Sequence, residues 1–221
     1  MTDLLLNANK IGSITDLLEK SKHIAIMPSK VAGADSYCAA AGLYLALKNK
    51  ELPVTFVYTG PAPEGCEGIL KDDEVMFDVS KRELEVSIDY SGTNAAKVHY
   101  ATENDVLLLT IGPVNKDFNT KDRVKTDIKG FDFDTIFTVG TQSLEDFGGV
   151  YEDLKEEFKS AQIVNIDNTD KNQNFGHLNI IDTSEMNLSL LVLNRLGEWK
   201  IKLDGRAAKA LLTGVTYRLL Q

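Results

Sequence analysis

The chain has 221 residues, of which 43% are hydrophobic and 26% are charged; this composition is typical of a folded protein and excludes intrinsic disorder. A net charge of −9 disfavours general coating of nucleic acid. No apolar run reaches the roughly 18 residues of a membrane span, so we expect no membrane partner. The chain has two cysteines and its start is unlike a secretory signal, which predicts a location in the reducing cytoplasm.

The first quarter of the chain predicts a strand, a helix and a second strand. Before these three elements, leucines and isoleucines at helical spacing over residues 4–18 indicate an amphipathic helix. Residues 23–27 (HIAIM) form a short apolar strand pattern, residues 35–50 an Ala- and Leu-rich helix, and residues 54–58 (VTFVY) the next strand. This succession is typical of a right-handed crossover in a parallel sheet.

The middle of the chain changes character. Residues 83–90, 96–100 and 106–111 include alternating segments separated by turn residues, which predicts antiparallel pairing. We therefore expect an antiparallel meander inserted between about residues 74 and 111.

Parallel-sheet patterning then resumes. Residues 135–139 (TIFTV) and 163–166 read as strands, with a helix near 151–158 between them, and helices over 185–196 and 206–220 close the chain. The prediction is a single α/β domain over residues 1–221, with a mostly parallel sheet flanked by helices and one antiparallel β insertion.

In open parallel sheets, ligands bind at the carboxyl ends of the strands. That rule selects the loops at residues 28–35, 140–143 and 167–176, and the segment near 213–218.

These loops carry sequence motifs. Residues 29–48 read SKVAGADSYCAAAGLYLALK, residues 139–148 read VGTQSLEDFG, and residues 166–176 read IDNTDKNQNFG. In this order they resemble the motifs of the DHH-family phosphoesterases of the nano-RNase (oligoribonuclease) and pAp phosphatase type, and residues 184–214 are similar to the closing helices of that family. The resemblance implies a five-stranded sheet of the DHH-domain kind, and we expect the C-terminal substrate-binding domain of those enzymes to be absent.

The departures from the family pattern fall on metal ligands. Those enzymes hold two divalent cations, usually manganese, with Asp and His side chains, and the resemblance keeps only Asp35 and Asp167 among these positions. Two carboxylates cannot hold two metals, so we expect no catalytic residue, no metal and no cofactor; any metal that binds would use Asp35 and Asp167. The ligand positions that carry other residues are Ser29, Gly33, Gly140, Asn168 and Thr169.

Several polar residues admit two interpretations. Asp35 could cap the helix that begins there, and Asp167 could close an Asx turn. Lys30 and Arg218 are either surface charges or replacements for the lost metal charge, and the loop that holds Thr141 and Ser143 could bind an anion with them. Structural roles are expected for the remaining candidates, His23, His99, His177 and Cys38.

The sequence thus predicts a catalytically inactive DHH-like domain that binds a small nucleotide or serves as a protein-interaction or assembly module, with a partner protein or in a homo-oligomer. The alternative is an active manganese-dependent phosphoesterase for short oligonucleotides or nucleotide phosphates, whose reduced metal site is completed by Asp170, Asp182 or a partner chain. An unpaired, apolar and exposed edge strand in the insertion would favour assembly.

Overall fold

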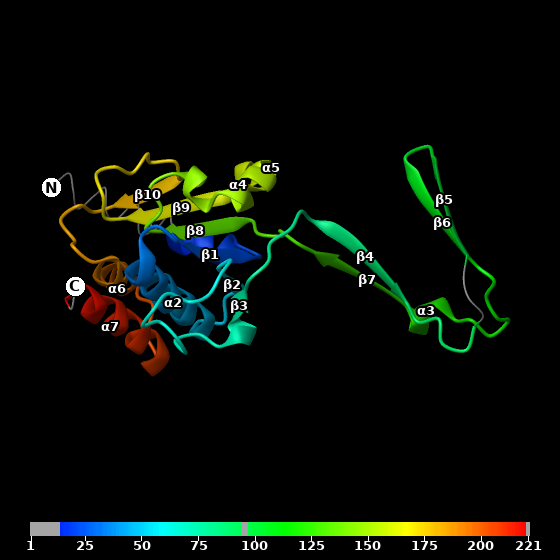
Figure 1. The fold of residues 1–221 in the computed structure, drawn as a ribbon, viewed down its shortest axis with the longest axis horizontal. Coiled ribbons are helices and arrows are strands. Elements are labelled where there is room, and N and C mark those ends of the chain that lie inside the picture. Colours follow the sequence, from blue (N-terminus) through cyan, green and yellow to red (C-terminus); the bar gives the residue numbers. More distant parts are fainter. Residues whose placement is uncertain (1–13, 94–96, 220–221) are drawn as a thin grey trace. The chain divides into compact units, whose positions relative to one another are not determined.

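The computed structural model describes residues 14–93 and 97–219, and the chain divides into two units (Figure 1). The first, which we call the α/β unit, consists of Met1–Lys81 and Gly130–Gln221. The second, which we call the β unit, is Arg82–Lys129. The insertion is therefore longer and later in the sequence than predicted.

A parallel sheet forms the centre of the α/β unit, with the strand order β10-β9-β8-β1-β2-β3 among the described residues. This confirms the predicted α/β class, although six strands are present where the resemblance implies five. The sequence analysis named neither edge strand, β3 nor β10; β3 has two residues, too few for a periodic pattern to reveal it. The strands are β1 (Ile24–Pro28), β2 (Val54–Val57), β3 (Val75–Met76), β8 (Thr135–Val139), β9 (Gln162–Asp167) and β10 (Leu178–Ile181).

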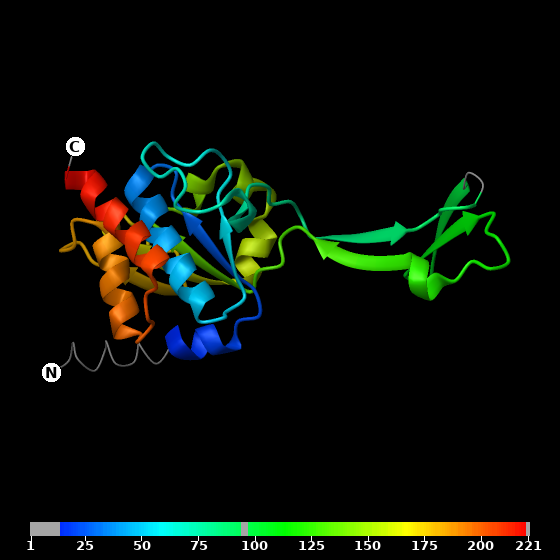
Figure 2. The same ribbon diagram turned by 90° about the horizontal axis from the view of Figure 1, so that it is seen from below.

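Helices cover both faces of this sheet (Figure 1). Helix α2 (Gly33–Asn49) packs between the sheet and the two closing helices, α6 (Leu188–Glu198) and α7 (Gly205–Leu219). Figure 2 shows these three helices side by side. The opposite face packs against α4 (Gly149–Asp153) and α5 (Lys155–Ser160).

Strand β1 shows how one strand serves two cores. Ile24 and Ile26 belong to the cluster on the α2 face, and Ala25 and Met27 belong to the cluster on the other face. Because successive side chains of a strand point to opposite faces, a strand buried on both sides must be apolar throughout. This constraint explains why the central strands could be recognised as continuous apolar runs.

Most predicted helices lie within a few residues of their expected positions. The helix expected near residues 151–158 is divided at Leu154, and a short 3-10 helix, η2 (Leu144–Phe147), precedes it. Residues 14–20 are helical, while the rest of the helix expected over residues 4–18 lies outside the described residues. No helix in the described ranges is long and apolar enough to span a membrane.

The β unit contains two separate antiparallel ladders instead of the predicted meander. Strand β4 (Glu83–Ile88) pairs with β7 (Val124–Lys129), and β5 (Lys97–Glu103) pairs with β6 (Val106–Gly112). A short helix, α3 (Thr120–Arg123), precedes β7. The meander prediction is wrong because β4 pairs with a strand some forty residues later in the chain, and no local pattern encodes that pairing.

A substitution at Gly214 tests how closely the closing helices are packed. A Cβ atom at this position would lie 2.0 Å from Ser189 Oγ and 2.8 Å from Cys38 Cβ. We expect Gly214→Ala to lower the free energy of unfolding by about 1–3 kcal/mol, because the packed helices must move apart. Urea denaturation measures this loss. Gly197→Ala in α6 is the control: no atom lies within 4 Å of its added Cβ, so it should be neutral or stabilising. Equal stability of the Gly214 variant and the wild type would contradict the packing.

Candidate functional site

A cleft of about 460 Å³ opens in the α/β unit where β1, β8 and β9 end. Two carboxylates, Asp35 and Asp167, line it, and the described lining residues include no Lys, Arg or His. The structure therefore brings together the two motif carboxylates that the sequence analysis singled out. The full lining is Ala32, Gly33, Ala34, Asp35, Gly140, Gln142, Asp167, Asn168, Thr169, Leu188 and Tyr217.

The Asp35 carboxylate binds the N-terminus of helix α6. Its Oδ2 accepts the backbone N–H of Leu188 at 2.8 Å, and its Oδ1 accepts the N–H and the hydroxyl of Ser189 at 3.1 and 2.9 Å. A carboxylate in this position satisfies N–H groups that have no partner within the helix and interacts favourably with the helix dipole. The expected capping role thus exists on a different helix, since α2 has no side-chain cap of its own.

Asn187 completes the same helix terminus. Its side-chain oxygen accepts the N–H of Leu190 at 3.0 Å, and its amide donates to the carbonyl of Gly214 at 3.2 Å. The sequence analysis missed this residue, although an Asn before a leucine-rich run is a recognisable start signal for a helix.

Asp167 is buried and bound by groups of its own loop. Its Oδ1 accepts the N–H of Asn168 at 2.8 Å, and its Oδ2 accepts the side-chain amide of Asn172 at 2.7 Å. Burial raises the pKa of the Asp167 carboxyl and the charge of Asp146 raises it further, while these hydrogen bonds and one from the N–H of Thr169 act in the opposite direction. The bond from the residue two positions on is the Asx arrangement that the sequence allows.

Asn172 is the second residue that the sequence analysis missed. Its amide also donates to the carbonyl of Thr141 at 2.8 Å, and its oxygen accepts from the amide of Asn165 at 2.7 Å and the N–H of Asn174 at 2.8 Å. These bonds tie the loop after β9 to the loop after β8. The motif IDNTDKNQNFG contained the signal, because buried Asn side chains need several partners.

Three of the residues at positions where the resemblance implies metal ligands form hydrogen bonds within the chain. Ser29 Oγ accepts the N–H groups of Val31 and Ala32 at 3.2 and 3.3 Å, the Asn168 amide donates to the carbonyl of Glu185 at 2.9 Å, and Thr169 Oγ1 accepts the N–H of Lys171 at 3.3 Å. Ser29 and Thr169 therefore stabilise the turns in which they lie, and Asn168 joins the loop after β9 to the segment before α6.

Two glycines with left-handed backbone stand at positions where the resemblance implies metal ligands. Gly33 has φ +67° and Gly140 has φ +69°. A Cβ atom on Gly140 would also lie 2.6 Å from Leu188 Cδ1, so the space that an aspartate would need there is filled. An aspartate at position 140 would be strained as well as crowded.

The donor set does not fit a two-metal centre. Over residues 14–93 and 97–219, no group of three or more His, Cys, Asp or Glu side chains could hold a metal ion. Of the two carboxylates in the cleft, Asp35 accepts three hydrogen bonds from α6, and both oxygens of Asp167 accept bonds from its loop.

The loop that was expected to bind an anion directs two of its N–H groups to a carboxylate of its own. The N–H groups of Gln142 and Ser143 donate to Asp146 Oδ2 at 2.9 and 3.2 Å, so an anion would have to displace that carboxylate. Thr141 is buried and its hydroxyl lacks a hydrogen-bond partner among the described residues. The side chain of Arg218 lies outside the described part of the chain.

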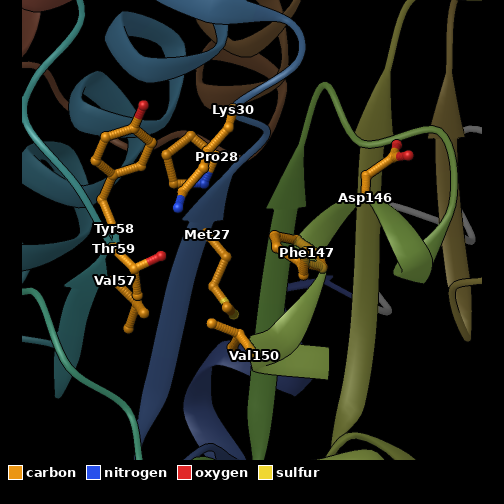
Figure 3. Close-up of a pocket in the computed structure, with 9 residues that line it drawn as sticks. All are labelled: Met27, Pro28, Lys30, Val57, Tyr58, Thr59, Asp146, Phe147 and Val150. Atoms are coloured by element: carbon orange, nitrogen blue, oxygen red, sulfur yellow. The ribbon is translucent and has the colours of Figure 1, made fainter. Parts of the chain in front are cut away.

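Lys30 faces a different pocket (Figure 3). Its ammonium lies 6.0 Å from the centre of the Tyr58 ring, and the pocket it lines has a volume of only about 20 Å³. This placement gives no support to the expectation that Lys30 replaces metal charge beside Asp35 or Asp167.

The histidines and cysteines are not among the residues that line the cleft. His23 Nδ1 lies 2.9 Å from Asp132 Oδ2, and His177 Nδ1 accepts the N–H of Ile163 at 3.1 Å. His99 belongs to strand β5. The buried thiols of Cys38 and Cys66 are 3.3 Å apart, and their hydrogen bond together with burial raises the pKa of Cys38.

Comparison with known proteins supports the fold. No protein-family model and no curated protein matches the chain. Among solved structures it is similar to an exopolyphosphatase-related protein from Bacteroides fragilis, with a TM-score of 0.62, 13% identity and 94% of this chain covered. The match covers 49% of that protein, so the chain spans about half its length. The likeness shows that the chain shares the α/β fold of that exopolyphosphatase-related protein.

Removing the Asp35 carboxylate tests its role at α6. We expect Asp35→Ala to lower the free energy of unfolding by about 2–4 kcal/mol, since three buried donors lose a charged acceptor. Asp35→Asn should cost less because it retains one acceptor oxygen. Chemical denaturation measures both, with exposed Asp78→Ala as the control. A neutral Asp35→Ala variant would show that these bonds contribute nothing.

Asp167 should make stability depend on pH. The pKa of the Asp167 carboxyl is higher in the folded protein than in the unfolded chain. Protonation of this carboxyl therefore adds stability that is fully present below the unfolded pKa of about 3.9 and is lost as the pH rises through the folded pKa. The stability of Asp167→Asn minus that of the wild type should therefore increase with pH over this window. Denaturation at pH 3 to 7 measures the difference, with Asp78→Asn as the control. A difference that stays constant or falls would be inconsistent with a raised pKa.

Proposed function

We propose that this chain is a catalytically inactive phosphoesterase-like protein that acts as an assembly module. The α/β unit supplies a stable scaffold, and the β unit supplies the interaction surface. The observation that carries the proposal is the engagement of Asp35, whose carboxylate accepts three hydrogen bonds from the N-terminus of α6.

The contacts at two of the implied ligand positions, Gly140 and Asp167, support the loss of metal chemistry. Hydrolysis of a phosphodiester by a two-metal centre requires ligands that hold both cations beside the attacking and leaving oxygens. In this chain Leu188 fills the space beside Gly140, and Asp167 is bound by Asn172. Recovering a metal site would require breaking contacts that hold α6 and the loop after β9.

Assembly is better supported than nucleotide binding. A phosphate group is attracted to backbone N–H groups, to Lys and Arg, or to a cation. The described lining of the cleft provides two carboxylates and no basic side chain, and the N–H groups of Gln142 and Ser143 are bound to Asp146. The β unit, in contrast, exposes apolar strands, the feature that favours a protein partner.

Hydrolysis assays test the inactivity. The wild-type protein with manganese should give no turnover of short oligonucleotides, of 3′,5′-phosphoadenosine or of bis(p-nitrophenyl) phosphate above the rate of buffer with manganese. Loss of even one charge-stabilising group commonly slows such reactions by about 10²- to 10³-fold, and most of the ligand cluster is replaced here.

Asp35→Asn is the discriminating control in this assay, because it keeps the size of the side chain and removes its charge. A manganese-dependent rate in the wild type that disappears in Asp35→Asn would overturn the proposal. It would establish instead the alternative, a phosphoesterase with a reduced metal site.

A further inference from the structure

The β unit lacks a core of its own. No described residue of Arg82–Lys129 is buried. Ten of the fifteen exposed large hydrophobic side chains in the described chain nevertheless lie in this segment. A two-stranded ladder in water is marginally stable at best, so two such ladders with exposed apolar side chains need a covering surface.

In the ladder of β4 and β7, apolar and charged side chains lie on opposite faces. Leu84 pairs with Ile128, and residues paired across an antiparallel ladder share a face. Glu85 lies on the other face and forms an ion pair of 2.5 Å with Lys129. Leu84 is 65% exposed and Ile128 43%, so the apolar face is uncovered.

In the hairpin of β5 and β6 the charged side chains also share one face, although Val106 and Leu108 lie on that face as well. Tyr100 pairs with Leu109, Val98 with Ile111 and Thr102 with Leu107. Tyr100 is 79% exposed and Leu107 62%. The acidic and basic side chains of the hairpin strands lie on the opposite face; they are Lys97, His99 and Glu103. We call the uncharged face formed by Val98, Tyr100, Thr102, Leu107, Leu109 and Ile111 the hairpin face.

We propose that the hairpin face binds the hairpin face of a second copy of this chain. This inference rests on the proposed function and names its partner. Because the face carries no charge, placing it against an identical face brings no like charges together. The β unit has seven basic and eight acidic residues, so it holds −1 of the net charge of −9. Two acidic chains therefore repel each other least at this unit.

The exposed apolar area of the hairpin face is that of a small dimer contact. Burying one Val, Leu or Tyr side chain removes on the order of 100 Å² of apolar surface. On the hairpin face, the exposed large apolar side chains are Val98, Tyr100, Leu107 and Leu109. They supply roughly 400 Å² per copy, about half of the ~800 Å² per partner of a standard interface, which is the size of a small contact between two copies.

Adjacent leucines of β6 provide a matched test. Leu107 lies on the hairpin face and Leu108 on the opposite face, and they are 62% and 55% exposed. Sedimentation equilibrium of the full-length wild type over a concentration series should give twice the chain mass of 24.4 kDa. Leu107→Lys should raise the dissociation constant by ~100-fold or more, since two charges would be buried at the contact. Leu108→Lys should leave it within about threefold.

Three results would overturn the second copy as partner. The first is a monomeric wild type at every concentration, and the second is equal weakening by the two lysine variants. The third is a monomer that sediments with neutral phosphatidylcholine vesicles, which would assign the hairpin face to a lipid surface. None of these results alters the hydrolysis assay, so failure of the dimer and failure of the inactivity proposal remain distinguishable. Circular dichroism of each variant verifies that its folded content is unchanged.

Discussion

The contact between the Asp35 carboxylate and the first turn of α6 organises the α/β unit. It joins the start of α2 to a helix 153 positions later in the chain, and both helices pack on the same face of the sheet. The carboxylate is buried, and buried charge is tolerated only with partners of opposite polarity. Here the helix terminus supplies that polarity, which elsewhere a cation can supply.

The rest of the cleft is likewise held by contacts between residues of the chain itself. Leu188, whose N–H binds Asp35, also fills the space beside Gly140. Asn172 holds Asp167 and the carbonyl of Thr141, so the loops after β8 and β9 are tied to each other by amide groups. In a cleft built this way, the hydrogen bonds of both carboxylates stabilise the α/β unit.

The sequence revealed the strands that are buried on both faces, because β1 is apolar throughout and β8 contains only apolar and threonine side chains. It also indicated the loops that meet at the cleft, since parallel strands end at one edge. It did not reveal that Asp35 binds Leu188 and Ser189, because no local pattern links residues so far apart. Strand β7 (VKTDIK) alternates polar and apolar residues, yet its partner β4 could be identified only in the folded chain.

Paramagnetic broadening by Mn²⁺ tests most directly whether the carboxylates of the cleft are engaged by the chain itself. The backbone N–H groups of Leu188 and Ser189 report on Asp35, and that of Asn168 reports on Asp167. Their amide resonances in the full-length protein should remain sharp at equimolar Mn²⁺, no broader than amides of the opposite face of the sheet. Selective loss of these resonances at substoichiometric Mn²⁺ would show that a metal binds in the cleft and would contradict the account.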